Sequence, residues 1–382
     1  MADFKLESWE REPLWLKLLT PFLKKKRFPA LPSQPKPGQW YRIYPEGCVD
    51  ANGERTYANF QLGIENKLLV YYSGGGLSWN EYTAARQESL YSKNPSEGFY
   101  MVHVDLFTDL RMNTGIFENQ PRNPFQNWSK LVFNYNTGDF HAGDGDFPYL
   151  ALDGSQRVVH HHGFRNYQAV MQIAKRLVSA PDCMLVTGCS GGAFGAALVA
   201  DDLAEQYPAC ENITCLADSG FFRLPDWYGI AKDVWHAPQK SVERIHSDNI
   251  MLDALTSLHQ KHGERVKCLF SSSVRDGFLG RMMQYVESGI FSFSNAGGDL
   301  CYRELQQFID ELRAAVPTVG LYFFDVPDKK QKGLDLTIHC IIGGEFAYSY
   351  QQSGMSVIQW LEKAVQGDVR QIGLPLLHRE ES

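Results

Sequence analysis

Short apolar runs alternate with segments of helical spacing along the chain from residue 65 onward. The apolar runs predict buried strands at 67–72, 99–104, 131–134, 183–186, 213–217, 267–271 and 319–326. The helical segments follow most of them, at 79–89, 167–177, 193–206, 280–287, 301–314 and 354–364. This alternation predicts an α/β fold with a mostly parallel central sheet, helices on both faces and inserted loops.

The first 38 residues have a different pattern. Residues 13–28 combine apolar and basic side chains at roughly helical spacing, and prolines at positions 29, 32, 35 and 37 follow them. We therefore expect an N-terminal amphipathic segment and a Pro-rich linker over 1–38, and a single catalytic domain over 39–382. A short helix packed on the domain is favoured for 13–28, and weak contact with a membrane surface is the alternative.

Composition restricts the class of protein and its partners. The chain has 382 residues, 44% of them hydrophobic and 21% charged, which is typical of a globular protein with a large core. The net charge of −7 argues against nucleic acid as the main partner. Acidic residues at positions 3, 7, 10 and 12 do not fit a cleavable signal peptide. We therefore expect a cytoplasmic protein, or a secreted one if a leader has been removed.

The eight cysteines, at positions 48, 183, 189, 210, 215, 268, 301 and 340, form no C-x-x-C pair. Structural zinc is therefore disfavoured. In a cytoplasmic protein we expect these thiols to be reduced. Disulfides remain the alternative for a secreted protein.

The motif with the most chemical content is Gly188-Cys189-Ser190-Gly191-Gly192, which lies between a predicted strand and a predicted helix rich in small residues. Strand, G-x-S-x-G and helix together are typical of a nucleophile elbow, in which a sharp turn presents the serine hydroxyl at the strand tip. An ordinary strand-to-helix turn is the alternative, because the pentapeptide alone is a weak signal in a chain with 33 glycines. The strands predicted at 267–271 and 319–326, each followed by a loop, complete the layout of an α/β-hydrolase.

In that fold the acid and then the histidine follow the serine along the chain. Asp276 comes just after the strand predicted at 267–271, and His339 follows the strand predicted at 319–326. A neutral imidazole removes the serine proton during attack, and a carboxylate fixes the imidazole tautomer. We therefore predict Ser190, Asp276 and His339 as a catalytic triad. The competing acids, less favoured, are Asp325, Asp328 and Asp335, and the competing histidine is His378, near the chain end.

A glycine-rich segment, Ser73-Gly74-Gly75-Gly76-Leu77, directly follows the strand predicted at 67–72. It is similar to the oxyanion loop of esterases, whose backbone N–H groups stabilise charge on the substrate oxygen. The candidate donors are the amides of Gly75 or Gly76 together with that of Gly191. A tight turn is the alternative, and a phosphate cradle is disfavoured because no G-K-[ST] follows.

The chain resembles the pectin acetylesterase and Notum group of serine carboxylesterases. The likeness spans roughly residues 65 to 345, and four blocks carry it in order: 73–77 with Trp79-Asn80, 188–192, Cys215-Leu216-Ala217-Asp218-Ser219-Gly220-Phe221-Phe222, and Ile338-His339-Cys340-Ile341-Ile342. The resemblance implies the same triad and no cofactor. Leu77 stands where the family usually has tryptophan, and Gly191 where it usually has alanine. Leu77 and Trp79 are therefore candidates for substrate contact.

A second cluster of polar residues lies between Asp139 and His162. It contains Asp139, His141, Asp144, Asp146, His160, His161 and His162. These residue types can bind calcium or a transition metal, but no EF-hand register or H-E-x-x-H spacing is present. We therefore expect no metal site, and Asp139 and His162 are instead candidates for lining the catalytic cleft.

Two classes of function remain open. The first is a serine carboxylesterase, with deacetylation of a carbohydrate as the favoured activity and a Notum-type lipid or protein O-deacylase as the alternative. The second is a binding protein on a hydrolase fold that no longer catalyses. An intact Ser, Asp and His in the required order favours the enzyme.

Overall fold

The computed structural model describes residues 28–88, 98–102, 109 and 111–378. The predicted amphipathic segment 13–28 therefore lies outside the described residues except for Phe28, and so does the end of the strand predicted at 99–104. Among the described helices, none combines the length and the apolar character that crossing a bilayer requires.

Nine strands of the described chain form the central sheet. Their spatial order is β1 (Trp40–Ile43), β2 (Ala58–Gln61), β6 (Ser129–Phe133), β3 (Lys67–Tyr72), β9 (Cys183–Cys189), β10 (Ile213–Asp218), β11 (Val266–Ser273), β12 (Gly320–Phe324) and β13 (Gln371–Ile372). β2 pairs with its two neighbours in antiparallel fashion, and every other pairing is parallel. The predicted α/β-hydrolase-like fold with a mostly parallel sheet is confirmed.

Alternate residues of the central strands supply the two faces of the sheet, because successive side chains of a strand point to opposite sides. In β3, Leu68 and Val70 belong to one buried core and Leu69 and Tyr71 to the other. Both faces are covered, which is why these strands read as continuous apolar runs in the sequence.

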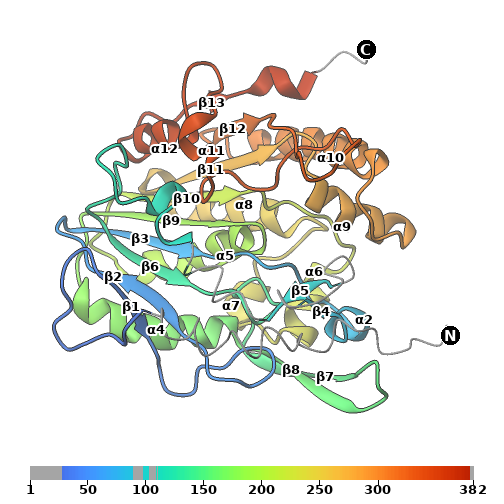
Figure 1. Cartoon of the computed structure of the whole chain (residues 1–382), viewed down its shortest axis with the longest axis horizontal. Coiled ribbons are helices and arrows are strands. Elements are labelled where there is room, and N and C mark those ends of the chain that lie inside the picture. Colours follow the sequence, from blue (N-terminus) through green and yellow to red (C-terminus); the bar gives the residue numbers. More distant parts are fainter. Residues whose placement is uncertain (1–27, 89–97, 103–108, 110, 379–382) are drawn as a thin grey trace.

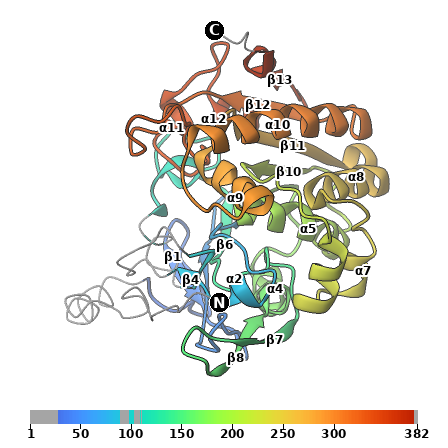
Figure 2. The same ribbon diagram turned by 90° about the vertical axis from the view of Figure 1, so that its right-hand side faces the viewer.

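Helices cover both faces. α4 (Gly163–Leu177), α5 (Gly191–Gln206), α8 (Ile250–His262), α9 (Gly277–Ser288) and α10 (Asn295–Ala315) contribute to the first core, and α11 (Phe346–Ser349) and α12 (Val357–Val365) to the second. Figure 2 shows α5 and α8 on one side of the strands and α11 on the other.

Several elements differ from the sequence-based prediction. The helix predicted at 79–89 is only α2 (Glu81–Ala84), and it is followed by β4 (Gln87–Glu88), which pairs with β5 (Tyr100–Met101) outside the central sheet. Residues 139–162, expected to be loop, contain an antiparallel hairpin of β7 (Gly145–Leu150) and β8 (Gln156–His161), seen at the lower end of Figure 1.

Helix α8 was not predicted. The short segments α6 (Trp227–Gly229), η4 (Ile230–Val234) and α7 (Gln239–Val242) precede it. The remaining short elements are η3 (Gly115–Phe117), η5 (Gly263–Arg265) and η6 (Leu374–His378).

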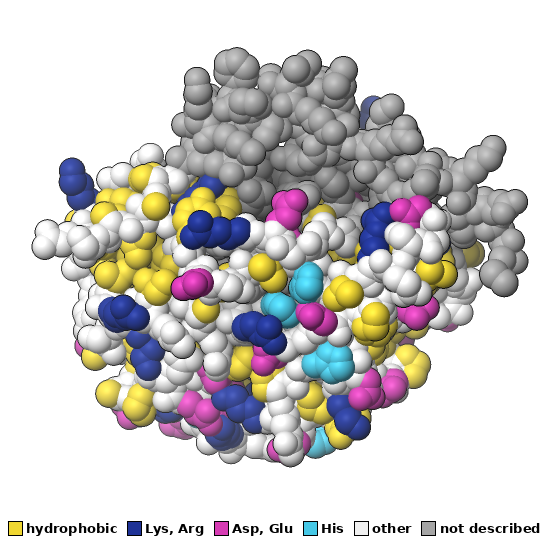
Figure 3. Space-filling model, turned by 90° about the horizontal axis from the view of Figure 1, so that it is seen from below, with side chains coloured by type: hydrophobic (Ala, Val, Ile, Leu, Met, Phe, Trp, Pro, Cys, Tyr) yellow, Lys and Arg dark blue, Asp and Glu magenta, His cyan; other side chains and the backbone are white. Residues whose placement is uncertain are grey.

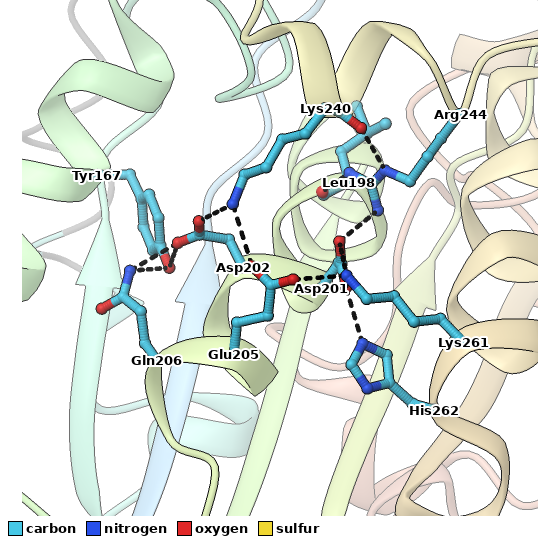
Figure 4. Close-up of polar contacts among 10 residues, drawn as sticks. All are labelled: Tyr167, Leu198, Asp201, Asp202, Glu205, Gln206, Lys240, Arg244, Lys261 and His262. Atoms are coloured by element: carbon cyan, nitrogen blue, oxygen red, sulfur yellow. Dashed lines mark hydrogen bonds and ion pairs between the residues drawn. The ribbon is translucent and has the colours of Figure 1, made fainter.

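A polar network fixes the C-terminal half of α5, the helix that begins directly after Ser190 (Figure 4). Asp201 contacts Lys261 Nζ at 2.8 Å and His262 Nε2 at 2.7 Å, both from α8. Asp202 pairs with Lys240 of α7 and accepts the Tyr167 hydroxyl of α4 at 2.9 Å. Because Asp201 and Asp202 are buried, these contacts compensate their lost hydration and hold α5 against three neighbouring helices.

Candidate active site

Ser190 lies at the tip of β9, between the strand and α5. Its backbone has φ 57° and ψ −128°, a left-handed conformation that is strained for a residue with a side chain. The glycines two residues to either side permit this turn. A Cβ on Gly188 would lie 2.1 Å from the Gly192 carbonyl oxygen, and one on Gly192 would lie 2.0 Å from that of Tyr72. The G-x-S-x-G sequence therefore forms the sharp strand-to-helix turn that is typical of a nucleophile elbow, and Ser190 is partly exposed.

The glycine-rich loop after β3 packs directly on this elbow. A Cβ on Gly74 would lie 2.6 Å from the Ser190 Cβ and 3.1 Å from the Gly191 nitrogen. The Gly76 carbonyl oxygen lies 3.0 Å from where a Gly191 Cβ would stand and accepts the Tyr135 hydroxyl at 2.8 Å. Gly74, part of the predicted oxyanion loop but not one of its predicted donors, thus packs directly against the serine. Its lack of a side chain permits that approach.

Of the predicted donors, Gly76 lies beside Gly191, whereas an added Cβ on Gly75 would lie 2.5 Å from the Tyr135 ring. Gly191 is the first residue of α5, where backbone N–H groups have no partner inside the helix. The loop itself is held through other groups, since Gly75 O accepts the Met101 N–H at 2.7 Å and Leu77 N–H donates to Phe99 O at 2.8 Å. The N–H groups of these three glycines make no hydrogen bond to another described residue.

Asp276 and His339 are brought together by two loops. His339 Nδ1 lies 2.6 Å from Asp276 Oδ2, and the Asp276 carboxylate is fully buried. The other carboxylate oxygen accepts the N–H groups of Phe278 and Leu279 at 2.9 and 3.1 Å, so Asp276 also caps α9. Among the described carboxylates, Asp276 hydrogen-bonds His339, whereas Asp325, Asp328 and Asp335 do not.

The pKa of His339 is raised above 6.5 by its surroundings. Burial alone lowers it, but the charge of Asp276 and the hydrogen bond to that carboxylate more than offset the burial. The imidazole side chain is 14% exposed. This environment favours the imidazolium, the form that His339 takes after it accepts a proton.

Asp218 connects the serine to the histidine loop. Its backbone oxygen accepts the Ser190 N–H at 2.9 Å. Its carboxylate is fully buried and accepts the N–H groups of Ile341 and Ile342 at 2.9 and 3.0 Å. Burial raises the pKa of this carboxyl to about 6, although these hydrogen bonds oppose the shift. Asp218 is therefore a structural link between the β9 tip and the segment that follows His339.

The chain neighbours of Ser190 and His339 also meet. Cys189 Sγ accepts the Tyr71 hydroxyl at 3.1 Å, and the neighbouring Cys340 lowers the pKa of the Cys189 thiol despite its burial. All eight cysteines carry free thiols in the structure.

The four residues predicted to contact substrate have different surroundings. Leu77 is 1% exposed and belongs to the first core. Trp79 is 8% exposed and packs edge-on against Phe99, with Tyr285 also against its ring. Asp139 is fully buried and accepts the backbone N–H groups of two residues of its own loop and of Gly163, the first residue of α4, so it ties the loop to that helix. His162 contacts Asp146. Substrate contact by these residues stays a prediction.

An aromatic group that the sequence did not single out lies beside His339. The ring of Phe278 is 5.3 Å from that of His339 and 43% exposed. The guanidinium of Arg281 lies 5.3 Å from the Phe278 ring, 4.2 Å from the Phe291 ring and 4.8 Å from the Phe293 ring. Arg281 is 6% exposed and makes no hydrogen bond to another described residue. Its burial and proximity to Phe278 are visible only in the folded chain.

The chain is similar to one family model and to plant proteins among those compared. The family model described as pectinacetylesterase matches residues 58–299. Pectin acetylesterase 11 from Arabidopsis thaliana is 27% identical over 184 residues, which cover 46% of this chain and 43% of that protein. Pectin acetylesterase 7 from the same plant is 26% identical over 183 residues, with the same coverage. The chain thus matches less than half the length of either relative.

One sequence-based prediction is overturned by these findings. We expected a cytoplasmic protein, but the similar proteins are plant pectin acetylesterases, which are secreted and act on pectin of the cell wall. The cytoplasmic assignment is therefore wrong. The acidic residues at positions 3–12, on which it rested, do not decide the compartment.

Proposed function

The chain belongs to the pectinacetylesterase family, and from this premise we propose that it is a serine carboxylesterase that removes acetyl groups from a carbohydrate. The observation that carries the proposal is the 2.6 Å contact between His339 Nδ1 and Asp276 Oδ2, on loops tied to the Ser190 elbow through Asp218. A buried carboxylate bonded to a histidine, with a strained serine joined to the histidine loop through Asp218, supports nucleophilic acyl transfer by these three residues.

In the proposed reaction, Ser190 Oγ attacks the ester carbonyl carbon while His339 Nε2 takes the hydroxyl proton. Asp276 keeps the imidazole in the required tautomer and stabilises the imidazolium. His339 then returns the proton to the departing sugar oxygen, which leaves an acetyl group on Ser190. Water, deprotonated by the same imidazole, releases acetate and restores the serine.

Negative charge develops on the carbonyl oxygen in both steps. The N–H group of Gly191, together with that of Gly75 or Gly76, is the proposed donor set, and the close approach of Gly74 to the elbow supports it. Fixed donors of this kind are worth about 3–4 kcal/mol each in the transition state.

The surroundings of His339 favour a sugar as the alcohol part of the substrate. The exposed Phe278 ring beside the histidine offers an apolar face against which a sugar ring can pack. Arg281, behind that ring, is a buried cation without a hydrogen-bond partner among the described residues, and such a group favours an anion. The carboxyl of Glu88 is its charged neighbour, and burial raises the pKa of that carboxyl to about 7 although the charge of Arg281 opposes the shift. We assign Arg281 the role of binding the carboxylate of an acidic sugar in the substrate.

A Notum-type lipid or protein O-deacylase and a non-catalytic binding protein are the alternative functions. A series of p-nitrophenyl esters from acetate to palmitate, together with acetylated polysaccharides, separates them. The proposal expects fast hydrolysis of acetate, falling activity on longer chains, and release of acetate from the polysaccharide. Highest activity on palmitate would favour the lipid deacylase, and no hydrolysis of any ester would favour the binding protein.

A further inference from the structure

The hairpin of β7 and β8 and the residue that follows it carry a cluster of imidazole and carboxylate groups that the proposed Ser190, Asp276 and His339 triad does not use. Asp146 of β7 lies directly opposite His160 of β8 in the register of the hairpin. His162 follows β8 and immediately precedes α4. The residue between the two histidines, His161, is fully buried and bonds to the Thr137 backbone oxygen at 2.8 Å. Strand alternation therefore separates His160 and His162 from His161 and directs both toward Asp146.

The three side chains converge on one point. Asp146 Oδ1 lies 2.7 Å from His160 Nδ1 and 2.8 Å from His162 Nε2. One ligand atom from each of the three residues lies within 4.8 Å of the others. Asp146 is 57% exposed, His160 28% and His162 9%, so solvent reaches the cluster from the Asp146 side. Figure 3 shows histidine side chains beside acidic ones on this face.

This donor set suits a particular class of ion. Two imidazole nitrogens and one carboxylate oxygen are ligands for Zn²⁺ and other borderline transition metals, whereas Ca²⁺ and Mg²⁺ prefer oxygen alone. Around a tetrahedral Zn²⁺ with bonds of about 2.0–2.1 Å, neighbouring ligand atoms stand about 3.3 Å apart. The nitrogens would therefore move away from Asp146 Oδ1 by about half an ångström, a change within the reach of side-chain rotation.

Charges of both signs surround the cluster. Arg165 places a positive charge near His162, but its Nε pairs with Asp144 Oδ1 at 2.6 Å, and Asp146 supplies a negative charge at the site itself. His236 packs beside Gly145, where an added Cβ would lie 2.5 Å from its ring.

The hairpin backbone is continuous across the site, with paired residues from Gly145 opposite His161 to Leu150 opposite Gln156. The ligands are thus presented by a rigid element.

We propose that Asp146, His160 and His162 form a binding site for a divalent transition-metal ion of the Zn²⁺ class, with water completing its coordination. The bound ion joins the hairpin to the first turn of α4, where Asp139 accepts the Gly163 N–H at 2.7 Å. Its role is to brace this end of the molecule, and it does not depend on the esterase proposal. The grouping replaces the sequence-based expectation of no metal site, because the hairpin that creates it was not predicted.

The test is a Zn²⁺ titration of the full chain, free of any affinity tag and stripped of metal, at about pH 8 where imidazole is neutral. Calorimetry should show one ion bound per chain, and the melting temperature should rise with Zn²⁺ but not with Ca²⁺. His160→Ala and Asp146→Asn should each weaken binding at least tenfold. His246→Ala, which removes an exposed histidine elsewhere, is the matched control and should bind as wild type does.

Two results would overturn the proposal. In one, the wild-type chain binds no Zn²⁺ stoichiometrically. In the other, His160→Ala and Asp146→Asn bind it as tightly as the control. Either result would mean that the three side chains only hydrogen-bond one another and hold no metal ion. Hydrolysis of p-nitrophenyl acetate, measured in the same samples, reports on the esterase proposal separately.

Discussion

The backbone oxygen of Asp218 accepts the Ser190 N–H at 2.9 Å, while the carboxylate of Asp218 holds the two residues that follow Cys340. One residue at the end of β10 thus fixes both the elbow and the loop of the proposed general base. The fixation is possible because Cys189 and Asp218 are register partners at the tips of neighbouring parallel strands. The position of Ser190 relative to His339 therefore depends on Asp218, a residue that takes part in no step of the proposed reaction.

Asp218→Asn should impair catalysis more than binding. An amide has one carbonyl oxygen, so it cannot accept all the hydrogen bonds that the carboxylate accepts, and the His339 loop should shift. Small misplacements of catalytic groups cost about 10²-fold in rate. We expect kcat to fall by about that factor with KM little changed.

The matched control is Ser271→Ala, which removes a single hydroxyl bonded to Asp218 Oδ1 at 2.9 Å. It should cost about 1 kcal/mol of stability and leave kcat near wild type. A kcat for Asp218→Asn equal to that of this control would show that Asp218 does not position the catalytic groups.

The pH dependence of hydrolysis should report the His339–Asp276 pair. The base must be neutral to act, and its pKa is raised above 6.5, so kcat/KM should rise with pH through a midpoint above that value. Asp276→Asn removes the carboxylate that raises the pKa. It should move the midpoint downward and lower kcat by about 10⁴. An unchanged midpoint in Asp276→Asn would assign the acid elsewhere, and Asp325→Asn would be the next variant to measure.

The same pair makes a stability contribution of defined sign. Because the folded-state pKa of His339 is raised, the pair stabilises the fold fully below the unfolded pKa of 6.5. That contribution is lost as the pH rises through the folded pKa. Denaturation of wild type and Asp276→Asn at several pH values should show a stability difference that is larger on the acid side.

Arg281 should determine preference for acidic substrates. Arg281→Met keeps a side chain of similar length against Phe278 and its neighbours but removes the charge. A charge-assisted hydrogen bond is worth about 1.5–3 kcal/mol, so KM on acetylated uronic-acid oligosaccharides should rise at least about tenfold. KM on acetylated neutral oligosaccharides and on p-nitrophenyl acetate should stay near wild type. An equal rise on acidic and neutral substrates would mean that Arg281 only supports the surrounding aromatic rings.

Leu77 was expected to contact substrate, but its burial predicts a different outcome for Leu77→Trp. The side chain is 1% exposed within the first core, so a larger ring has no space without displacing its neighbours. Overpacking of this kind costs about 1–3 kcal/mol. The free energy of unfolding should therefore fall by that amount. A Leu77→Trp variant with wild-type stability and altered selectivity between acetate and butyrate would show instead that Leu77 faces the acyl group.

The central strands were predictable because both faces of the sheet are covered. Continuous apolar runs located β3 at its observed bounds, and β9, β10 and β11 within two or three residues. Chain order placed Asp276 after the strand observed as β11 and His339 after the strand observed as β12. The hairpin of β7 and β8 escaped prediction because most of its residues are only partly buried or exposed, so no apolar run marks it.

Other parts of the site could not be read from residue types. Gly74 acts by the absence of a side chain, and Asp218 acts partly through its backbone oxygen. Neither contribution leaves a chemical signature in the sequence. The helix expected at 79–89 ends at Ala84 because residues 87–88 pair with β5 instead, a tertiary contact that overrides local helical preference.

The most direct test of the central claim is covalent labelling with a fluorophosphonate, which reacts with activated serine nucleophiles. Intact-mass measurement of wild type should show one label per chain, and peptide mapping should place it on Ser190. Ser190→Ala should fold as wild type does, take up no label and release no acetate from acetylated polysaccharide. Labelling at another serine, or hydrolysis by Ser190→Ala at the wild-type rate, would contradict the account.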